Sequence, residues 1–173
     1  PKDVDIWRVT VNDNETVQMD YEKAAFSDFQ SYLIYKDLGT NYALQYEEID
    51  RNKTPFLSTG NNTLANSYCY KMEIKNTCSL VSDTLTANTH CTINVEATGG
   101  ENKNLVDWNH YFGWDSVATY TILRQEVDIP GNWRELATIS GGLNTYMDSL
   151  VYCNITYAYK IQAAEFSGNN QIS

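Results

Sequence analysis

Leu105 to Arg124 reads LVDWNHYFGWDSVATYTILR, which is two apolar segments separated by a turn-rich centre. In the first segment Val106 and Trp108 occupy alternate positions, the period-2 pattern of a half-buried strand. From Val117 onward the alternation resumes, and the Thr, Tyr and Ile side chains there suit a pleated surface. The stretch therefore predicts a strand, a loop and a second strand, with Trp108 as a core anchor.

The pattern of this stretch occurs twice in the chain. Three pairs of segments match in the same order, at offsets of 87, 88 and 89 residues. The pairs are Asp20-Tyr21 with Asp107-Trp108, Tyr32–Lys36 with Tyr120–Arg124, and Tyr68–Met72 with Tyr157–Ile161. A unit of about 85 residues is long enough to fold with a modest core of its own. We therefore expect two domains, residues 1–88 and 89–173.

Short alternating segments separated by turn residues predict about seven strands in each copy. In the first copy they are residues 6–11, 17–21, 31–36, 43–49, 55–57, 67–75 and 80–87. In the second copy they are residues 92–97 and 104–108 around a Gly99-Gly100 turn, then 119–125, 134–139, 145–148, 156–164 and a truncated strand after Gly168. No stretch shows a helical period with caps. The sequence therefore predicts an all-β fold of two tandem seven-stranded, immunoglobulin-like β-sandwiches.

Several aromatic residues have expected positions in such a sandwich. Trp7 lies on the first strand and is expected in the core, and Trp133 is expected to pack on the fourth strand of the second copy. Tyr68 and Tyr157 follow long polar loops at the start of the sixth strands, where a tyrosine corner bonds its hydroxyl group to backbone. The expected positions of these residues can be checked in a structure, and they therefore test the sandwich prediction.

The charge and the motif content exclude several classes of function. The net charge is -10 and the isoelectric point about 4.5, which disfavours a nucleic-acid partner or an anionic membrane surface. No run of 18 apolar residues predicts a membrane span. There are two histidines, and the patterns GxSxG, HExxH, P-loop and GxGxxG do not occur. We expect no enzyme, no metal site and no cofactor, although the carboxylates leave a glycosidase pair or calcium binding near Asp3 and Asp5 open.

The four cysteines bear on the cellular compartment. They are Cys69, Cys78, Cys91 and Cys153, and no two of them form a CxxC pair. An even number of cysteines in an acidic β protein fits an oxidising compartment. Four buried thiols in a cytosolic protein are the alternative.

The strand motifs resemble those of a known family. They are Val106/Trp108, Tyr120/Ile122/Arg124, Trp133/Leu136/Ile139, Thr145/Tyr146/Asp148 and Tyr157/Tyr159/Ile161, which look like the motifs of fibronectin type III domains. Four stretches are similar to tandem domains of gliding-motility and cell-surface proteins of Bacteroidetes-type bacteria, which are exported by the type IX system. These stretches are His90–Ile93, Tyr111–Trp114, Tyr70–Cys78 and Ser167–Asn169.

The resemblance covers nearly the whole chain, and it is looser in the first copy, where Tyr21 replaces the core Trp. The terminal Pro-Asn-Gly-Asp-Gly segment of that family does not occur in the sequence, so the export route is only inferred. Because the sequence starts abruptly at Pro1, we expect an excerpt of a longer protein.

The resemblance also orders the cysteines in space. In a type III sandwich Cys69 and Cys91 lie near the same pole, so their pairing is favoured, with a loop of about 22 residues and a contribution of roughly 3 kcal/mol. Such a bridge would pin the second domain to the first. Cys78–Cys91 is the second choice, and four free thiols remain an alternative. Cys78–Cys153 is excluded within one chain, and Cys153 would pair with a cysteine beyond Ser173.

Two kinds of surface site follow from the sequence. Tyr111, Phe112 and Trp114 lie in the central loop, where exposed aromatic rings stack on sugars or anchor a protein partner. The alternative is that Trp114 folds back over the edge of the sandwich. Asp-Ser/Thr-aliphatic triplets resemble the O-glycosylation sites of such bacteria, and their acceptors would be Thr84, Ser116 and Ser149.

Together these observations predict a non-catalytic structural or spacer segment of a large secreted or cell-surface bacterial protein. The resemblance links it to gliding motility or adhesion. Its partners would be neighbouring domains of the same longer chain, and a protein or glycan at the cell surface. The alternatives are a glycan- or protein-binding module that uses the loop around Trp114, and accessory domains of a secreted hydrolase.

Overall fold

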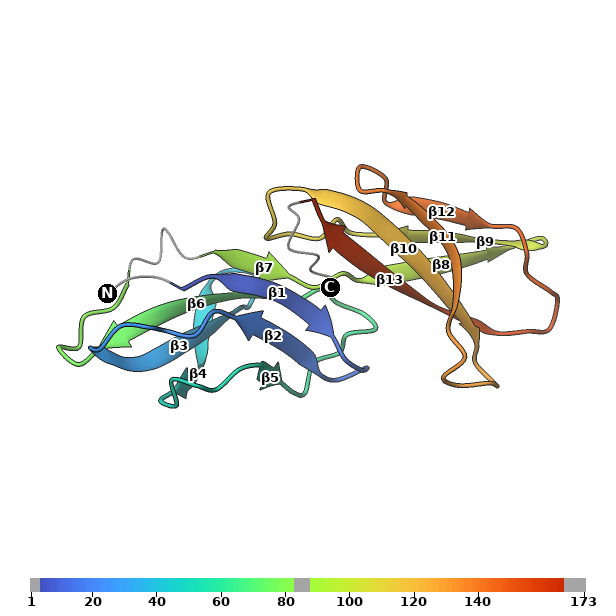
Figure 1. Ribbon diagram of the computed structural model, residues 1–173. Helices are drawn as coiled ribbons and strands as arrows, with labels where there is room; N and C mark the ends of the chain where they lie inside the picture. The colour runs from blue at the N-terminus through green and yellow to red at the C-terminus, as the bar shows by residue number, and fades with distance from the viewer. Residues whose placement is uncertain (1–3, 83–87, 167–173) are drawn as a thin grey trace. The chain divides into compact units, whose positions relative to one another are not determined.

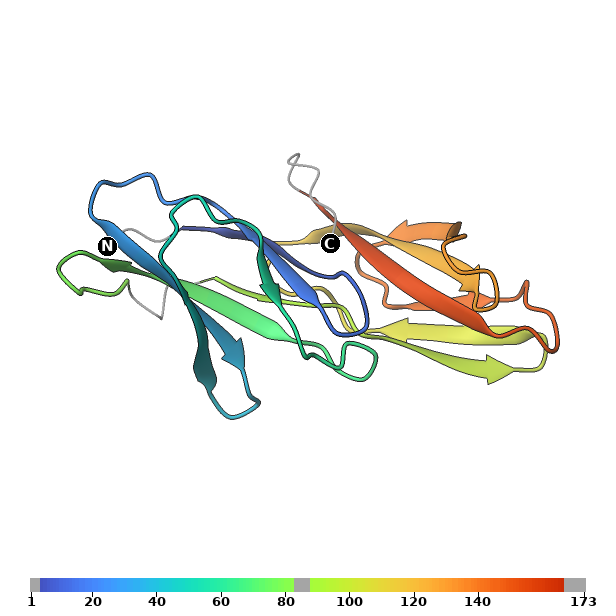
Figure 2. The ribbon, with the colours of Figure 1, turned by 90° about the horizontal axis from the view of Figure 1, so that it is seen from below.

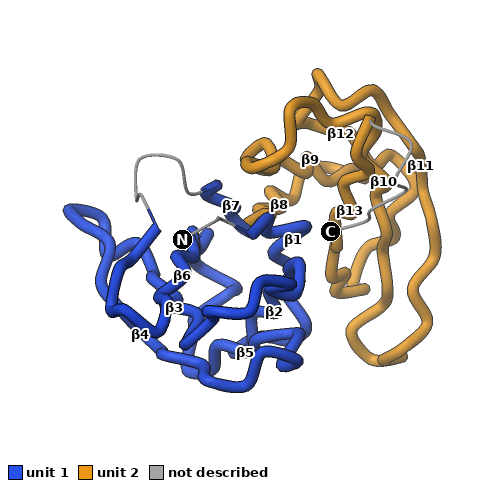
Figure 3. The backbone as a smooth tube through the Cα atoms, turned by 60° about the vertical axis from the view of Figure 1, so that its left-hand side comes forward, with its two compact units in different colours: residues 1–92 blue, residues 93–173 orange. Residues whose placement is uncertain are grey.

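The computed structural model describes residues 4–82 and 88–166, and every regular element in these ranges is a β-strand. The chain divides into two compact units, residues 1–92 and residues 93–173, which Figure 3 shows in blue and orange. In the part of the chain that the structure describes, no helix is long and apolar enough to cross a membrane. The predicted all-β class is confirmed.

Unit 1 consists of two antiparallel sheets (Figures 1 and 2). The three-stranded sheet has the order β1–β2–β5, with β1 Ile6–Val11, β2 Val17–Tyr21 and β5 Phe56–Ser58. The four-stranded sheet has the order β4–β3–β6–β7, with β3 Phe29–Asp37, β4 Tyr42–Glu48, β6 Cys69–Asn76 and β7 Thr89–Cys91. Consecutive strands switch between sheets after β2, β4 and β5, which is the connectivity of a sandwich rather than of a single meander.

The core of unit 1 lies between its two sheets. Inward-facing side chains of β1 and β2 meet those of β3 and β6, and the buried set is Ile6, Val9, Val17, Met19, Tyr21, Ala24, Phe29, Tyr32, Ile34, Tyr70, Met72 and Ile74. Because side chains on a strand alternate between faces, residues at every second position of one strand share this core. The inward parity predicted for Tyr70, Met72 and Ile74 is confirmed.

Unit 2 repeats the arrangement. One sheet has the order β8–β9–β12, with β8 Val95–Gly100, β9 Lys103–Trp108 and β12 Thr145–Asp148. The other has the order β11–β10–β13, with β10 Val117–Glu126, β11 Arg134–Ser140 and β13 Tyr157–Glu165. Their shared core holds Val106, Trp108, Tyr111, Tyr120, Ile122, Ile161 and Ala163. The seventh strand expected after Gly168 lies outside the described residues.

The internal repeat extends to single hydrogen bonds. In unit 1 the hydroxyl group of Tyr32 accepts a hydrogen bond from the backbone N–H of Ala24, at 2.8 Å. In unit 2 the hydroxyl group of Tyr120 accepts one from the N–H of Tyr111, also at 2.8 Å. Each tyrosine ring also makes an edge contact with the aromatic residue of the preceding strand, Tyr21 in unit 1 and Trp108 in unit 2. The two copies therefore share a buried polar anchor as well as a strand order.

Both predicted tyrosine corners are present. The hydroxyl oxygen of Tyr68 accepts a hydrogen bond from the N–H of Asn62 at 2.8 Å, and that of Tyr157 accepts one from Tyr152 at 3.2 Å. In each unit the bond ties the strand that follows the loop to the loop itself. The long polar loops before β6 and β13 are thus fixed to their sandwiches at the strand that follows.

Two predictions differ from the structure around the junction of the copies. The strand expected at residues 80–87 is wrong for its described part, because Leu80 to Ser82 turn back on the end of β6 through a single bridge between Lys75 and Val81. The last strand of unit 1 is β7, at Thr89–Cys91. The expected domain boundary between residues 88 and 89 therefore differs by four residues from the division after residue 92.

Three further predictions, the start of a strand, a hairpin turn and a buried tryptophan, fail because of local register. The strand expected from residue 92 begins only at Val95, and Gly99 and Gly100 belong to β8, paired with Asn104 and Lys103. The hairpin turn is Glu101-Asn102, where Asn102 has a φ of 55°. Trp7 is 44% exposed rather than buried, because the register shifts between Ile6 and Arg8 and leaves Trp7 in a bulge.

Candidate functional site

The aromatic loop predicted as a binding site connects β9 to β10. The ring of Tyr111 is buried, and it lies 4.1 Å from the ring of Trp114, measured between centroids. Trp114 is partly buried and packs against the core of unit 2. Phe112, between them in sequence, is 60% exposed. The structure thus joins Tyr111 and Trp114 as a cover for the core and leaves Phe112 as the exposed ring of the loop.

The repeat explains why the loop folds in this way. Tyr111 occupies the place that Ala24 has in unit 1, since both donate their N–H to the anchoring tyrosine hydroxyl. The much larger side chain at this place is part of the buried core of unit 2, and the ring of Trp114 packs against it. Gly113 allows the sharp turn between them, because its φ of 130° is a conformation that L side chains rarely adopt.

A buried ion pair holds the loop that follows β12, at the end of unit 2 away from the aromatic loop. Arg124 on β10 donates to the carboxylate of Asp148 at 2.7 Å and to the backbone oxygen of Leu150 at 2.9 Å. Asp148 also accepts hydrogen bonds from the hydroxyl group of Tyr159 and from the N–H of Leu150. Burial opposes the charge of Arg124, but the bonded carboxylate outweighs it and raises the arginine pKa. Burial, with the adjacent Asp148, raises the pKa of Tyr159 to about 12.

The proposed glycan acceptors have different environments. Ser116, before β10, and Ser149, after β12, are exposed. Asp148, the first residue of the Ser149 triplet, is 1% exposed and binds Arg124. Thr84 lies outside the described residues. The aspartate of the Ser149 triplet therefore has a structural function of its own.

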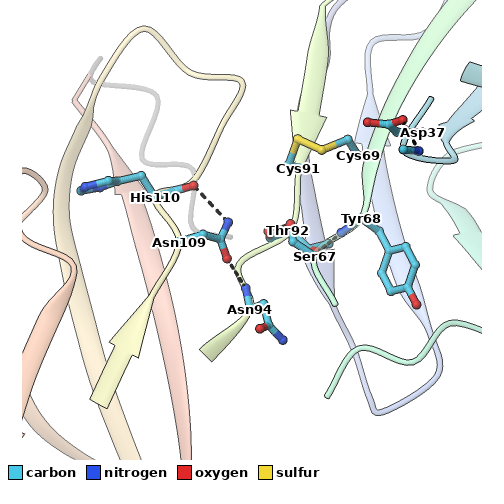
Figure 4. Close-up of a disulfide and its surroundings, with 10 residues drawn as sticks. Asp37, Ser67, Tyr68, Cys69, Cys91, Thr92, Asn94, Asn109 and His110 are labelled. Carbon is cyan, nitrogen blue, oxygen red and sulfur yellow. Dashed lines mark hydrogen bonds between the residues drawn. A yellow bond between two sulfur atoms is a disulfide. The ribbon is translucent and has the colours of Figure 1, made fainter. Parts of the chain in front are cut away.

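Cys69 and Cys91 form a disulfide, the expected pair (Figure 4). Cys69 is the first residue of β6 and Cys91 the last of β7, and the two are directly opposite in the antiparallel ladder. Their Cα atoms are 4.0 Å apart and 22 residues separate them in sequence. Because β7 belongs to unit 1, the bridge lies within that unit, and the expectation that it pins the second domain to the first is wrong. Cys78 and Cys153 are exposed free thiols.

Thr92 fixes the chain next to the disulfide. Its backbone N–H donates to the oxygen of Tyr68 at 2.9 Å, and its hydroxyl group accepts from the N–H of Tyr68 at 2.9 Å. The hydroxyl group of Ser67 donates to the backbone oxygen of Thr92 (Figure 4). The point at which the chain leaves unit 1 is therefore held by one covalent bond and three hydrogen bonds.

A groove that sequence reasoning missed lies between the edge strands β4 and β5 of unit 1. Its volume is about 440 Å³. Its walls include the rings of Tyr46 and Phe56, stacked at 5.6 Å, with Glu48 and Lys53 as charged groups. A sandwich is open where two sheet edges face each other, so the groove follows from the order of strands in both sheets. Its walls come from two consecutive strands that belong to different sheets, and no sequence motif marks it.

The described residues offer no metal centre. In residues 4–82 and 88–166, no group of three or more His, Cys, Asp or Glu side chains could hold a metal ion. His90 is buried in β7 and His110 is exposed beside the aromatic loop, in different units. What the surface offers is an exposed Phe112, a shallow groove and two free thiols.

Comparisons with known proteins found similar chains among solved structures. No protein-family model and no curated protein matches the sequence. Among solved structures, the two-domain fibronectin type III segment of chicken tenascin is 14% identical, with a TM-score of 0.39, over 100% of this chain and 95% of the segment. The first three fibronectin domains of chicken contactin are 13% identical, with a TM-score of 0.39, over 100% of this chain. The chain spans 61% of that contactin structure.

The fold class rests on the architecture itself. Each unit has two antiparallel sheets around its own core, a shared polar anchor and a tyrosine corner. This is the architecture of a pair of fibronectin type III-like β-sandwiches. A fold of this class does not by itself specify a function.

Proposed function

We propose that the chain is a non-catalytic structural segment of a large secreted or cell-surface bacterial protein, with a role in gliding motility or adhesion. The observation that carries this proposal is the direct succession of two sandwiches, each with its own core, with unit 1 ending at residue 92 and unit 2 beginning at residue 93. Such modules serve to space and display other domains of the same chain.

The disulfide supports a location outside the cytoplasm. Disulfides persist in oxidising compartments and are rare in the cytosol. The bacterial context and the type IX route come from the sequence resemblance, which the tandem sandwich fold fits. The net charge of -10 disfavours nucleic acid as a partner.

A second candidate function is a binding module for a protein or glycan. The exposed ring of Phe112 favours it, with Tyr111 and Trp114 acting as the rigid base that orients the loop. A single exposed ring provides a small contact, so this function would need further domains of the chain to give useful affinity. Glycans at Ser116 and Ser149 would be covalent modifications of the module rather than its ligands.

The test replaces the segment in the native protein. In one strain residues 1–173 are exchanged for two unrelated tandem sandwiches of the same length, and in another only Phe112→Ser is introduced. Antibody against a tag in the segment is applied to intact cells, with a cytoplasmic protein as control. A structural segment requires labelling of intact cells and retained gliding or adhesion after the exchange. Loss of both activities in the exchange strain and in Phe112→Ser would identify a binding module instead, and absence of surface labelling would refute the location.

A further inference from the structure

The chain leaves unit 1 through a short strand. β7 has three residues and, among the described strands, pairs with β6 alone, through Cys69–Cys91, Tyr70–His90 and Lys71–Thr89. The residue that follows it, Thr92, is the last of the unit. Tension that arrives from the following domain would act first on the hydrogen bonds of Thr92 with Ser67 and Tyr68, and then on this three-residue ladder.

The position of the disulfide changes which residues carry that tension. Cys91 is the last residue of β7, so a force on Thr92 reaches the sulfur bridge after one residue. From Cys91 the force passes to Cys69 and then toward the N-terminus, and residues 70–90 form a closed loop outside the path. We infer that the Cys69–Cys91 disulfide is a force clamp that keeps residues 70–90 out of the load path. The inference rests on the proposed structural function, since it requires a chain under tension.

The closed loop contains the strand that most needs protection. β6 is an inner strand of its sheet, paired with both β3 and β7. It contributes Tyr70, Met72 and Ile74 to the core, each at most 3% exposed. With the clamp intact, unfolding extends residues 1–69, while β6 stays within a short covalent loop, close to the residues with which it must pair again. A smaller loop closes with a smaller loss of chain entropy.

Reduction of the disulfide would release residues 70–90 and so increase the length of chain that tension can extend. A thiolate of a dithiol reductant attacks one sulfur of the bridge and forms a mixed disulfide, and the second thiolate of the reductant displaces the other cysteine. The protein receives two electrons and two protons as two cysteine thiols, and the reductant leaves as a cyclic disulfide. Under tension the released loop adds its contour length. Twenty-two residue steps at about 3.5 Å each, less the span of the bridge, amount to roughly 7 nm.

Single-molecule force spectroscopy of the full chain tests the clamp. The chain is held by handles at both ends and stretched in the oxidised form, and then in the presence of dithiothreitol. The unfolding step of one unit is expected to lengthen by roughly 7 nm on reduction, and the step of the other unit, which contains no disulfide, stays constant as an internal control. Equal step lengths in both conditions, with the bridge verified by peptide mapping, would overturn the inference.

A variant excludes effects of the reductant itself. Cys69→Ala/Cys91→Ala is expected to show the long step in both conditions, and Cys78→Ala/Cys153→Ala the same change on reduction as the native chain. If the first variant does not fold, the native chain with and without reductant still decides the question. The result is independent of the cell-surface test. A clamp that is present in a protein that cells do not expose would refute the proposed function alone, and surface exposure without a change in step length would refute the clamp alone.

Discussion

Single buried charges decide much of the stability of unit 2. Arg124 and Asp148 have side chains that are 10% and 2% exposed, and they stand between two sheets where water cannot compensate them. A buried pair of this kind contributes little compared with an apolar pair, but removal of one partner leaves the other charge without compensation. Tyr159 and the backbone of Leu150 complete the set of hydrogen bonds. The pair therefore fixes the residues after β12 onto β10.

Asp148→Ala is expected to lower the free energy of unfolding of unit 2 by about 3–5 kcal/mol, because the Arg124 guanidinium loses its counter-charge inside the protein. Asp115→Ala removes an exposed carboxylate of the same unit and is the matched control, with an expected change within about 0.5 kcal/mol. Hydrogen exchange of the full chain in increasing urea, read peptide by peptide, measures both. Equal effects of the two substitutions would show that the buried pair does not stabilise the unit.

His90 gives unit 1 a dependence on pH. Burial lowers the pKa of its imidazole from the ordinary 6.5 to about 4, because the charged form loses its hydration. Between these values the unfolded chain binds a proton that the folded chain does not, so stability decreases as the pH falls from about 6.5 to about 4. The integrated loss from this residue is about 3 kcal/mol.

The measurement is urea unfolding of unit 1 at pH 7 and at pH 4, in the native chain and in His90→Gln. The variant is expected to lose most of the slope with pH, whatever its stability at pH 7. His110→Gln lies in unit 2 and serves as the control, with the unit 1 profile unchanged. A profile that is the same in the native chain and in His90→Gln would exclude the buried histidine as its source.

At the scale of elements, one close approach of backbone fixes how unit 2 turns from β11 to β12. Gly141 follows β11, and its N–H donates to the backbone oxygen of Ala118 at 2.9 Å. A Cβ atom added at Gly141 would lie 2.0 Å from the backbone oxygen of Val117. The adjacent Gly142 has no such neighbour, since its nearest contact would be the hydroxyl group of Ser140 at 3.9 Å. The two glycines look alike in sequence and differ in their surroundings.

Gly141→Ala is expected to destabilise unit 2 by about 3 kcal/mol, at the upper end of overpacking costs, because β10 or the turn must shift. Gly142→Ala is expected to stay within about 0.5 kcal/mol of the native chain. Thermal unfolding of the two variants, followed by the fluorescence of the buried Trp108, compares them directly. Similar melting temperatures for both variants would mean that the turn can relax away from β10.

At the scale of the whole molecule, the two units differ in whether a disulfide crosslinks two of their strands. Unit 1 has a disulfide between two adjacent strands, and the described part of unit 2 has none. Each unit has its own core, so each is expected to unfold in its own transition. The covalent bridge restricts only the unfolded state of the unit that contains it.

Reduction of the native chain is therefore expected to lower the free energy of unfolding of unit 1 by about 3 kcal/mol and to leave that of unit 2 unchanged. Urea unfolding with and without a reductant, resolved by hydrogen exchange for peptides of each unit, measures the difference. A non-reducing peptide map of the same sample should contain the Cys69–Cys91 cross-link, with Cys78 and Cys153 alkylated. A shift of both transitions would indicate that the units unfold together.

Much of the fold could be predicted because it follows from the local periodicity of apolar residues in the sequence. The alternation around Trp108, its earlier copy at Tyr21, and the parity of Tyr70, Met72 and Ile74 all follow from side chains that point to opposite faces of a strand. The exposed position of Trp7 could not be predicted in this way. A bulge shifts the parity by one residue, and it arises from the pairing of β1 with β2, not from β1 itself.

The candidate site was predicted less well, for a related reason. The sequence indicates an aromatic loop at Tyr111, Phe112 and Trp114, but the order of exposure inside it depends on the hydrogen bond between Tyr111 and Tyr120. The groove beside Tyr46 and Phe56 has no sequence signal, because its walls come from strands of different sheets. Spacing along a chain does not report such contacts.

The sequence by itself determined that this chain is all-β, that it contains one unit twice, and which faces of the strands are apolar, because these properties depend on neighbouring residues and on a constant offset. Only the tertiary structure decided where unit 1 ends, because Thr89–Cys91 become a strand only by pairing with β6. It also placed the Cys69–Cys91 bridge inside unit 1 rather than between the domains. Strand partners and the distances between remote residues depend on the packing of the whole sheet, and the sequence does not contain them in any local form.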